Sequence, residues 1–258
     1  MNSLYFFSGL PRSGSTWLVS ILTQNPNIFV TPQSSPFVEI FWRNYSIWKD
    51  INSDENFVND KIRNMKIPYL RDLTKLYYKQ LTDCPIVIDK RPAWHNIDNI
   101  KMYEDIFGKL PKIICPVRNV EEIAASFVSL FRNNGRNWYS HDMKDLLLQN
   151  YVNLKSTFNS EYKKCLLFVD YNDLVNDTPN ELERIYEFID EPLYTHKLDS
   201  VSVDKGFKKV EDIFGLKDMH TVKKGVSKSK IIPEDFLEKE ELLVYQNLTF
   251  WDKTFINS

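Results

Sequence analysis

The stretch from Phe6 to Trp17 constrains the fold of this chain more than any other. It reads FFSGLPRSGSTW: an apolar run, a loop bounded by Gly9 and Gly14, and then residues that begin a helical repeat. At the start of a helix, free backbone N–H groups and the helix dipole attract an anion. We therefore expect a strand, a phosphate-binding loop and a helix in direct succession. The alternative is a loop that only makes a tight turn.

Further apolar runs between turn residues indicate the rest of the sheet. Together with the first run, they lie at residues 4–7, 86–88, 113–117 and 166–169. A helical pattern follows each of them, which is typical of an α/β fold, here a three-layer sandwich with a central, mostly parallel sheet. Periodicity predicts a first helix that ends near Gln24 and a later helix over residues 178–189. The length and the apolar content of 43% suit a single domain, residues 1–258.

Two regions lie outside this alternation. Residues 31–78 have helical periodicity and an unusual number of aromatic side chains, among them Phe37, Phe41 and Trp42. These rings predict a lid, an acceptor pocket or ordinary helix packing, and the sequence leaves all three open. Residues 193–232 lose periodicity and gain Lys, Ser and Gly, which predicts a long surface segment.

Composition excludes several classes of protein. Lys and Arg total 33 against 35 Asp and Glu, so there is no overall positive field to hold a nucleic acid. The three cysteines show no CxxC or His-rich spacing for zinc, and we expect reduced thiols and a cytoplasmic location. No stretch approaches the roughly 20 apolar residues of a membrane span, and no leader is visible at the N-terminus.

The loop differs from that of a nucleoside triphosphatase at one decisive position. Gly9, Gly14 and Thr16 fit the spacing G-x-x-x-x-G-K-[ST], but Ser15 occupies the lysine position. Arg12 supplies the positive charge instead, and its planar guanidinium suits an anion with several oxygens. This argues against ATP hydrolysis, although a P-loop nucleotide kinase or NTPase remains the alternative enzyme.

With that arginine, the loop resembles a known motif. Residues 11–18 fit P-[KR]-S-G-[ST]-T-W-[LV], the 5′-phosphosulfate loop of the sulfotransferases that use 3′-phosphoadenosine 5′-phosphosulfate (PAPS), at every position. The resemblance implies their P-loop NTPase-like architecture and PAPS as the co-substrate. It also implies stacking of Trp17 on the adenine, although a core role for this ring is a competing interpretation. The residues it assigns to the 5′-phosphosulfate are Pro11, Arg12, Ser13, Gly14, Ser15 and Thr16.

A second anion site is expected at the strand over residues 113–117. Arg118 directly after it and Ser126 eight residues later resemble the family's 3′-phosphate motif. Asn119 with Glu122 forms a capping-box-like helix start, and helical geometry places Ser126 about two turns beyond Arg118. Because ATP has no 3′-phosphate, this pair favours PAPS over a nucleoside triphosphate.

Two looser resemblances complete the predicted donor site. Tyr171, after the strand at 166–169, lies in a segment similar to the family's Y-E-D-L, which implies a contact with the adenine, and a packing role is equally compatible. Residues 220–228 resemble the basic loop that closes over the donor, which would bring in Ser227 and Lys228. An ordinary solvated loop is the alternative for that segment.

Catalysis is expected at the carboxyl end of the strand that includes residues 86–88. Lys90 occupies the place of the family's catalytic lysine, which implies contact with the bridging or sulfonate oxygens, and Arg12 adds charge nearby. The general base stays open between His95, Glu39 and no side chain at all. The family's histidine position holds Pro92 here, and its glutamate position in other branches holds Gln33.

The resemblance implies a concrete activity. A sulfonate group passes from PAPS to a hydroxyl or amine of a small molecule, a saccharide or a peptide, and 3′,5′-ADP is released. No metal is expected, because no acidic cluster suggests a Mg²⁺ site. Because Pro92 and Gln33 stand where the family has its base, a further alternative is a protein that binds PAPS or 3′,5′-ADP without transferring the sulfonate. The sequence does not specify the acceptor or the oligomeric state.

Overall fold

The computed structural model describes residues 1–31, 34–53, 59–140, 143–201, 215–217 and 231–251. Its centre is a five-stranded sheet in the order β2-β3-β1-β4-β5, with every neighbouring pair parallel. The strands are β1 (Ser3–Phe7), β2 (Ile28–Val30), β3 (Ile86–Lys90), β4 (Ile113–Val117) and β5 (Leu166–Asp170). The predicted α/β fold with a parallel sheet is confirmed. Four strands match the predicted runs, and β2 is an edge strand that the sequence analysis did not predict.

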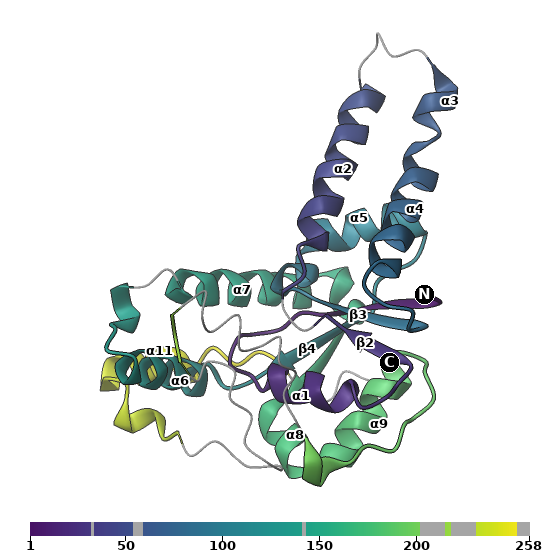
Figure 1. The fold of residues 1–258 in the computed structure, drawn as a ribbon. Coiled ribbons are helices and arrows are strands. Elements are labelled where there is room, and N and C mark those ends of the chain that lie inside the picture. The colour runs from purple at the N-terminus through teal and green to yellow at the C-terminus, as the bar shows by residue number, and fades with distance from the viewer. Residues whose placement is uncertain (32–33, 54–58, 141–142, 202–214, 218–230, 252–258) are drawn as a thin grey trace.

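Helices cover both faces of the sheet (Figure 1). The α-helices are α1 (Ser15–Leu22), α2 (Phe37–Ser53), α3 (Asp60–Arg63), α4 (Lys66–Lys79), α5 (Ile97–Phe107), α6 (Val120–Asn133), α7 (Met143–Phe158), α8 (Tyr171–Asn176), α9 (Thr178–Phe188) and α11 (Lys239–Gln246). The 3₁₀ turns are η1 (Pro92–His95), η2 (Trp138–Ser140), η3 (Glu161–Cys165), η4 (Leu198–Ser200) and η5 (Pro233–Asp235). Helices α1, α8 and α9 pack on one face, and α2, α4, α5, α6 and α7 pack on the other.

The strands read as continuous apolar runs because both of their faces are buried. Along β1, Phe6 enters the core beneath α5 and α6, whereas Phe7 enters the core beneath α1 and α9. The same alternation separates Ile113 from Ile114 in β4. A parallel sheet covered on both sides requires such runs, which is why periodicity located these strands.

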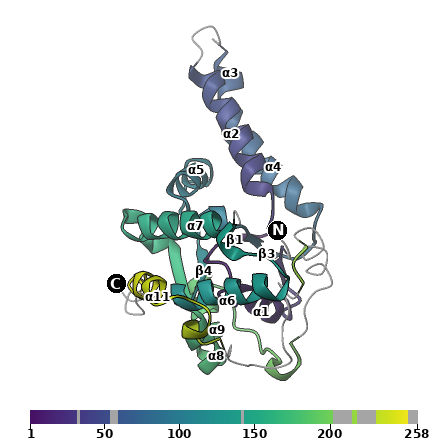
Figure 2. The ribbon, with the colours of Figure 1, turned by 90° about the vertical axis from the view of Figure 1, so that its left-hand side faces the viewer.

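Helices α2 and α4 form an arm that projects from the body of the molecule (Figures 1 and 2). At its base, Phe37 and Phe41 are buried core residues, whereas Trp42 further along α2 is exposed. An ion pair between Lys66 and Asp105 ties α4 to α5. The aromatic region therefore divides between core packing and exposed rings.

Two helix boundaries differ from the predictions. Helix α1 ends at Leu22 rather than near Gln24. At the start of α6, the predicted capping box does not form, because Asn119 makes no side-chain cap and the Glu122 carboxylate accepts a hydrogen bond from Arg118 instead. The charge-assisted bond to a buried guanidinium outweighs a bond to a backbone amide.

None of the described helices combines the length and the apolar character needed to cross a membrane. Most of the predicted surface segment, residues 193–232, lies outside the described residues. The expectation of a single domain over the whole chain stays a prediction.

Candidate functional site

The carboxyl ends of the strands bring the predicted site residues to one edge of the sheet. The register pairs Phe7, the last residue of β1, with Lys90 of β3, and it pairs Val117 with Asp170 at the ends of β4 and β5. The phosphate loop, Arg118 and Tyr171 therefore follow neighbouring strands at the same edge. This is where open α/β sheets bind their ligands.

The loop after β1 lies directly against β4. Ser8 donates its N–H to the Ile114 carbonyl at 2.9 Å, and Leu10 donates to the Pro116 carbonyl at the same distance. A Cβ atom on Gly9 would lie 2.1 Å from the Pro116 oxygen. Only glycine fits here, so the motif's first glycine is required by close backbone approach.

The loop ends at the start of α1. Gly14 takes a left-handed φ of +80° before the first turn of α1, and no side chain caps this helix. The Ser13 hydroxyl lies 2.5 Å from the Leu10 carbonyl and 3.0 Å from the Pro116 carbonyl, so it holds the loop in shape. Ser15 and Thr16 lie in the first turn of α1, and the backbone amides of a first helical turn are groups that can bind an anion.

Two guanidinium groups lie beside this loop. Arg118 is only 4% exposed, its Nε donates to Glu122 Oε2 at 2.6 Å, and its guanidinium carbon lies 4.4 Å from the centroid of the Tyr171 ring. Arg12 donates from Nε to the Ser126 hydroxyl at 3.1 Å. Burial, and then the charge of Arg118, lower the pKa of Arg12 to about 10. The structure thus brings Arg12, Arg118, Ser126 and Tyr171 together.

Lys90 lies at the end of β3, on the side of the sheet that faces α1. Its Nζ is 5.9 Å from the centroid of the Phe7 ring, and Phe7 leads into the loop. Burial lowers the pKa of the amine to about 8, so it is still mostly charged at neutral pH. An anion bound at the loop would stabilise that charge.

Comparison with known proteins identifies the family. A model of the sulfotransferase family matches residues 5–196, which include the loop, Lys90, Arg118 and Tyr171. The chain belongs to the sulfotransferase family. It is therefore a transferase enzyme, and the resemblance seen in its motifs is confirmed. A search of curated proteins gave no significant match.

Solved sulfotransferase structures share this fold at low sequence identity. The sulfotransferase domain of the Synechococcus PCC 7002 olefin synthase is 17% identical over 95% of each chain, with a TM-score of 0.51. The sulfotransferase domain of the curacin biosynthetic pathway is 17% identical over 79% of each chain, with a TM-score of 0.51. A Mycobacterium avium sulfotransferase is 14% identical over 93% of this chain and 74% of its own, with a TM-score of 0.50.

His95 occupies the interior of this sulfotransferase. The residue is 0% exposed, and its Nδ1 shares a 2.8 Å hydrogen bond with the Ser8 hydroxyl. Thr157 of α7 donates to its carbonyl at 2.5 Å. Burial lowers the pKa of the ring to about 4, so it is neutral at physiological pH. In this position His95 links η1 to the start of the phosphate loop and has no contact with solvent.

We expect His95 to make the free energy of unfolding depend on pH. Its pKa falls from 6.5 to about 4 on folding, so the unfolded chain takes up a proton first as the pH drops. The stability that depends on a neutral His95 is complete above pH 6.5, the pKa in the unfolded chain, and is lost as the pH falls toward about 4, the pKa in the folded protein. We expect the free energy of unfolding, measured in urea, to fall between pH 7 and pH 4.5 by about 2 kcal/mol more in the wild type than in His95→Asn. An equal loss in both would contradict this assignment.

Glu39 lies in the first turn of α2 and forms an ion pair with Arg91, the residue after Lys90. Its Oε1 faces the Arg91 guanidinium, and its Oε2 is enclosed without a hydrogen bond. The start of α2 is held to the same strand, because Ser35 donates its N–H to the Lys90 carbonyl at 2.9 Å. The Glu39 carboxylate is thus attached to the strand end that carries Lys90.

The other predicted residues are placed as follows. Trp17 is 9% exposed and packs in the apolar layer beneath α1 and α9. Pro92 is the first residue of η1. Gln33, Ser227 and Lys228 lie outside the described residues. The structure therefore leaves Trp17 little free surface for stacking.

Sequence reasoning missed Arg91 and the partnership of Glu122 with Arg118. Only Arg118 and Glu122 have a signal in the sequence, the i, i+4 spacing of a helical ion pair. Arg91 and Glu39 are 52 residues apart, so only the fold reveals their contact.

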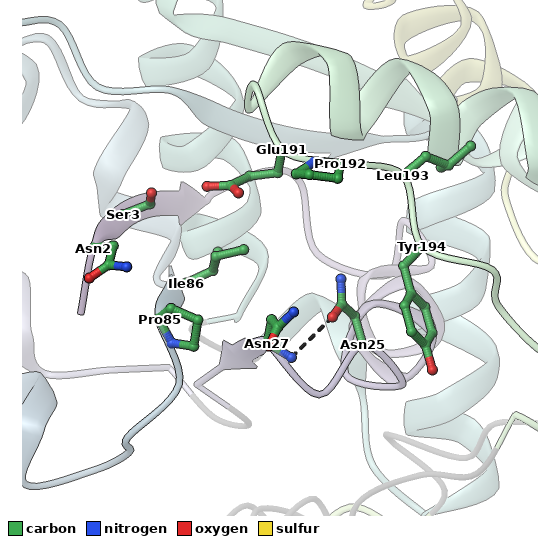
Figure 3. Close-up of a pocket in the computed structure, with 10 residues that line it drawn as sticks. All are labelled: Asn2, Ser3, Asn25, Asn27, Pro85, Ile86, Glu191, Pro192, Leu193 and Tyr194. Atoms are coloured by element: carbon green, nitrogen blue, oxygen red, sulfur yellow. Dashed lines mark hydrogen bonds between the residues drawn. The ribbon is translucent and has the colours of Figure 1, made fainter.

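A pocket lies at the amino ends of the strands, opposite the carboxyl ends that carry the candidate donor site (Figure 3). Its lining comes from the start of β1 at Asn2 and Ser3, from Asn25 after α1, and from residues 191–194 after α9. The carboxyl ends of the strands, with Lys90 and Arg118, face away from it. This pocket is therefore separate from the candidate donor site.

Proposed function

We propose that this sulfotransferase takes the sulfonate from PAPS, transfers it to an acceptor hydroxyl or amine, and releases 3′,5′-ADP. One observation carries the proposal: the phosphate loop and the Arg118–Ser126 pair meet at one sheet edge, where Arg12 contacts Ser126 at 3.1 Å. Two adjacent cationic positions suit a nucleotide phosphorylated at both its 5′ and 3′ oxygens. The buried Arg118 and the uncapped start of α1 supply the groups that such a ligand needs.

The chain's own residues would act as follows. The backbone from Gly9 to Thr16 holds the 5′ end of the donor in line with the acceptor. As the acceptor oxygen bonds to sulfur, the bond from sulfur to the bridging oxygen breaks, and the electron pair stays on the 5′-phosphate. Lys90 stabilises the negative charge that develops on that oxygen.

The acceptor's proton needs a base, and we propose Glu39 rather than His95. The Glu39 side chain is partly exposed beside the end of β3, and its Oε2 accepts no hydrogen bond from a described residue, whereas the His95 ring is enclosed and bonded to Ser8. A base must come within hydrogen-bond reach of the proton it removes, which favours Glu39.

Lys90 should set the alkaline limit of activity. Its pKa is lowered to about 8, so the free enzyme loses this charge as the pH rises above that value. We expect kcat/KM for PAPS to fall about tenfold per pH unit above that point, because this parameter reports the free enzyme. In Lys90→Arg the fall should move to higher pH, since a guanidinium stays charged. An unchanged alkaline limb in the variant would contradict the role.

The direct test is incubation with ³⁵S-labelled PAPS and a panel of hydroxyl and amine acceptors, among them small molecules, saccharides and peptides. Labelled product with equimolar 3′,5′-ADP supports the proposal. Tight 3′,5′-ADP binding without transfer would indicate a binding protein, and Mg²⁺-dependent ATP turnover would indicate a P-loop kinase. A cytoplasmic location and transfer without a metal stay predictions. Among the described residues, no three His, Cys, Asp or Glu side chains group as a metal site.

A further inference from the structure

We propose that Trp251 is a positioning residue of the donor site: its indole N–H holds Asp170, which in turn fixes the Tyr171 ring. Tyr171 lies where the Arg118 guanidinium and the phosphate loop meet, so the geometry of both depends on it. The inference rests on the proposed function and extends the site to a part of the chain beyond the family match, which covers residues 5–196.

The Tyr171 ring touches both segments that are predicted to bind the donor. Its centroid lies 4.4 Å from the guanidinium carbon of Arg118. On the loop side, a Cβ atom on Gly14 would lie 2.7 Å from Tyr171 Cδ2, so the ring packs directly against the loop backbone. Because protein interiors are close-packed, a small displacement of this ring changes its contacts with both segments.

Asp170 determines how the chain passes from β5 into Tyr171. It is the last residue of β5 and the N-cap of α8, where its Oδ1 accepts the N–H of Asn172 at 2.8 Å. Its Oδ2 accepts the indole N–H of Trp251, 81 residues away in sequence, at 3.2 Å. Burial raises the pKa of Asp170, and a partly desolvated carboxylate is destabilised when it loses a donor. Loss of the indole N–H should therefore shift Asp170 and the residue that follows it.

Contacts other than the bond to Asp170 hold the Trp251 segment on the body of the protein. The Phe250 ring lies between Tyr151 of α7 and Phe168 of β5, with centroid distances of 5.5 Å and 6.2 Å. The Tyr151 hydroxyl donates to the Leu248 carbonyl at 2.7 Å. Trp251 itself is only 9% exposed. The segment should therefore stay in place when the indole N–H alone is removed.

Calorimetric titration of the purified protein with 3′,5′-ADP tests the positioning role. Trp251→Phe keeps an aromatic ring and removes the N–H, and we expect it to weaken binding about three- to tenfold. In Tyr171→Leu, which lacks the ring that Trp251 positions, the same substitution should weaken binding no further. Tyr151→Phe is the matched control, because it removes a bond to the same segment at Leu248 and leaves Asp170 untouched. Both Phe variants should lower Tm by about 2–4 °C, but Tyr151→Phe should keep its affinity within about twofold.

Each outcome decides the question. Unchanged affinity in Trp251→Phe, or equal weakening with and without the Tyr171 ring, would overturn the inference, because Trp251 would then support only the fold. Absence of 3′,5′-ADP binding by the wild type would instead remove the proposed function, and the inference with it. Should Trp251→Phe lose its cooperative thermal transition, Asp170→Asn replaces it. Its side-chain oxygen can still cap α8, whereas its NH₂ group cannot accept the indole N–H, and the same comparison with Tyr171→Leu applies.

Discussion

Lys90→Met is expected to lower the turnover number by about 10²–10³-fold and to change the KM for PAPS by less than about threefold. The loss is confined to turnover because Lys90 stabilises charge that develops only as the bond to sulfur breaks. The measurement is the steady-state rate of ³⁵S transfer from PAPS to whichever acceptor the panel yields. The same rates, measured over a series of PAPS concentrations, give the KM.

Two controls accompany this variant. Lys112→Met removes a lysine that pairs with Asp190 at the other end of the sheet, and it should keep full turnover. Lys90→Met should also melt at a higher temperature than the wild type near pH 7, because burial lowers the pKa of Lys90 and its charge costs stability in the free protein. Turnover retained in a well-folded Lys90→Met protein would remove Lys90 from the mechanism.

Gly9→Ala is expected to destabilise the protein by about 3 kcal/mol or more and to abolish nucleotide binding. The added Cβ would lie 2.1 Å from the Pro116 oxygen and 2.7 Å from its nitrogen, both backbone atoms that cannot rotate away. The loop must therefore leave β4, and the amides that bind phosphate move with it. The expected fall in Tm is about 6–12 °C.

Gly108→Ala is the matched control for this variant. Gly108 ends α5 with a φ of +67°, and an added Cβ would meet nothing within 4 Å. The substitution should cost only the left-handed strain, about 1–2 kcal/mol, and leave 3′,5′-ADP binding intact. Equal effects of the two substitutions would show that backbone strain, rather than contact with β4, explains the requirement for Gly9.

Local patterns in the sequence predicted the parts of the fold that depend on local physics. The runs that became β1, β3, β4 and β5 are apolar on both faces, and each precedes a periodic helix, so pattern alone located them. Strand β2 has only three residues, which is too short for periodicity to distinguish it from a loop. The arm of α2 and α4 was visible as helical periodicity, but its projection from the body depends on packing against α5.

In the candidate site, too, local patterns predicted some residues, whereas contacts between distant segments could not be predicted. The phosphate loop is one continuous segment, so its residues were found together. The placement of His95 could not be predicted, because its burial depends on Ser8 and on Thr157 of α7, which are distant in sequence. Glu122 was predicted to form a capping box with Asn119, but it bonds to Arg118 instead. The capping rule uses neighbouring residues alone, whereas the burial of Arg118 depends on the tertiary fold. The contact between Arg12 and Ser126 likewise exists only once β1 and β4 are adjacent.

A crystal structure of the protein with 3′,5′-ADP would test most directly whether the loop and the Arg118 pocket hold one nucleotide. The account predicts the 5′-phosphate on the amides between Gly9 and Thr16, and the 3′-phosphate within hydrogen-bond distance of Arg118 and Ser126. A nucleotide bound at the opposite edge of the sheet, or with its 3′-phosphate directed away from Arg118, would contradict it.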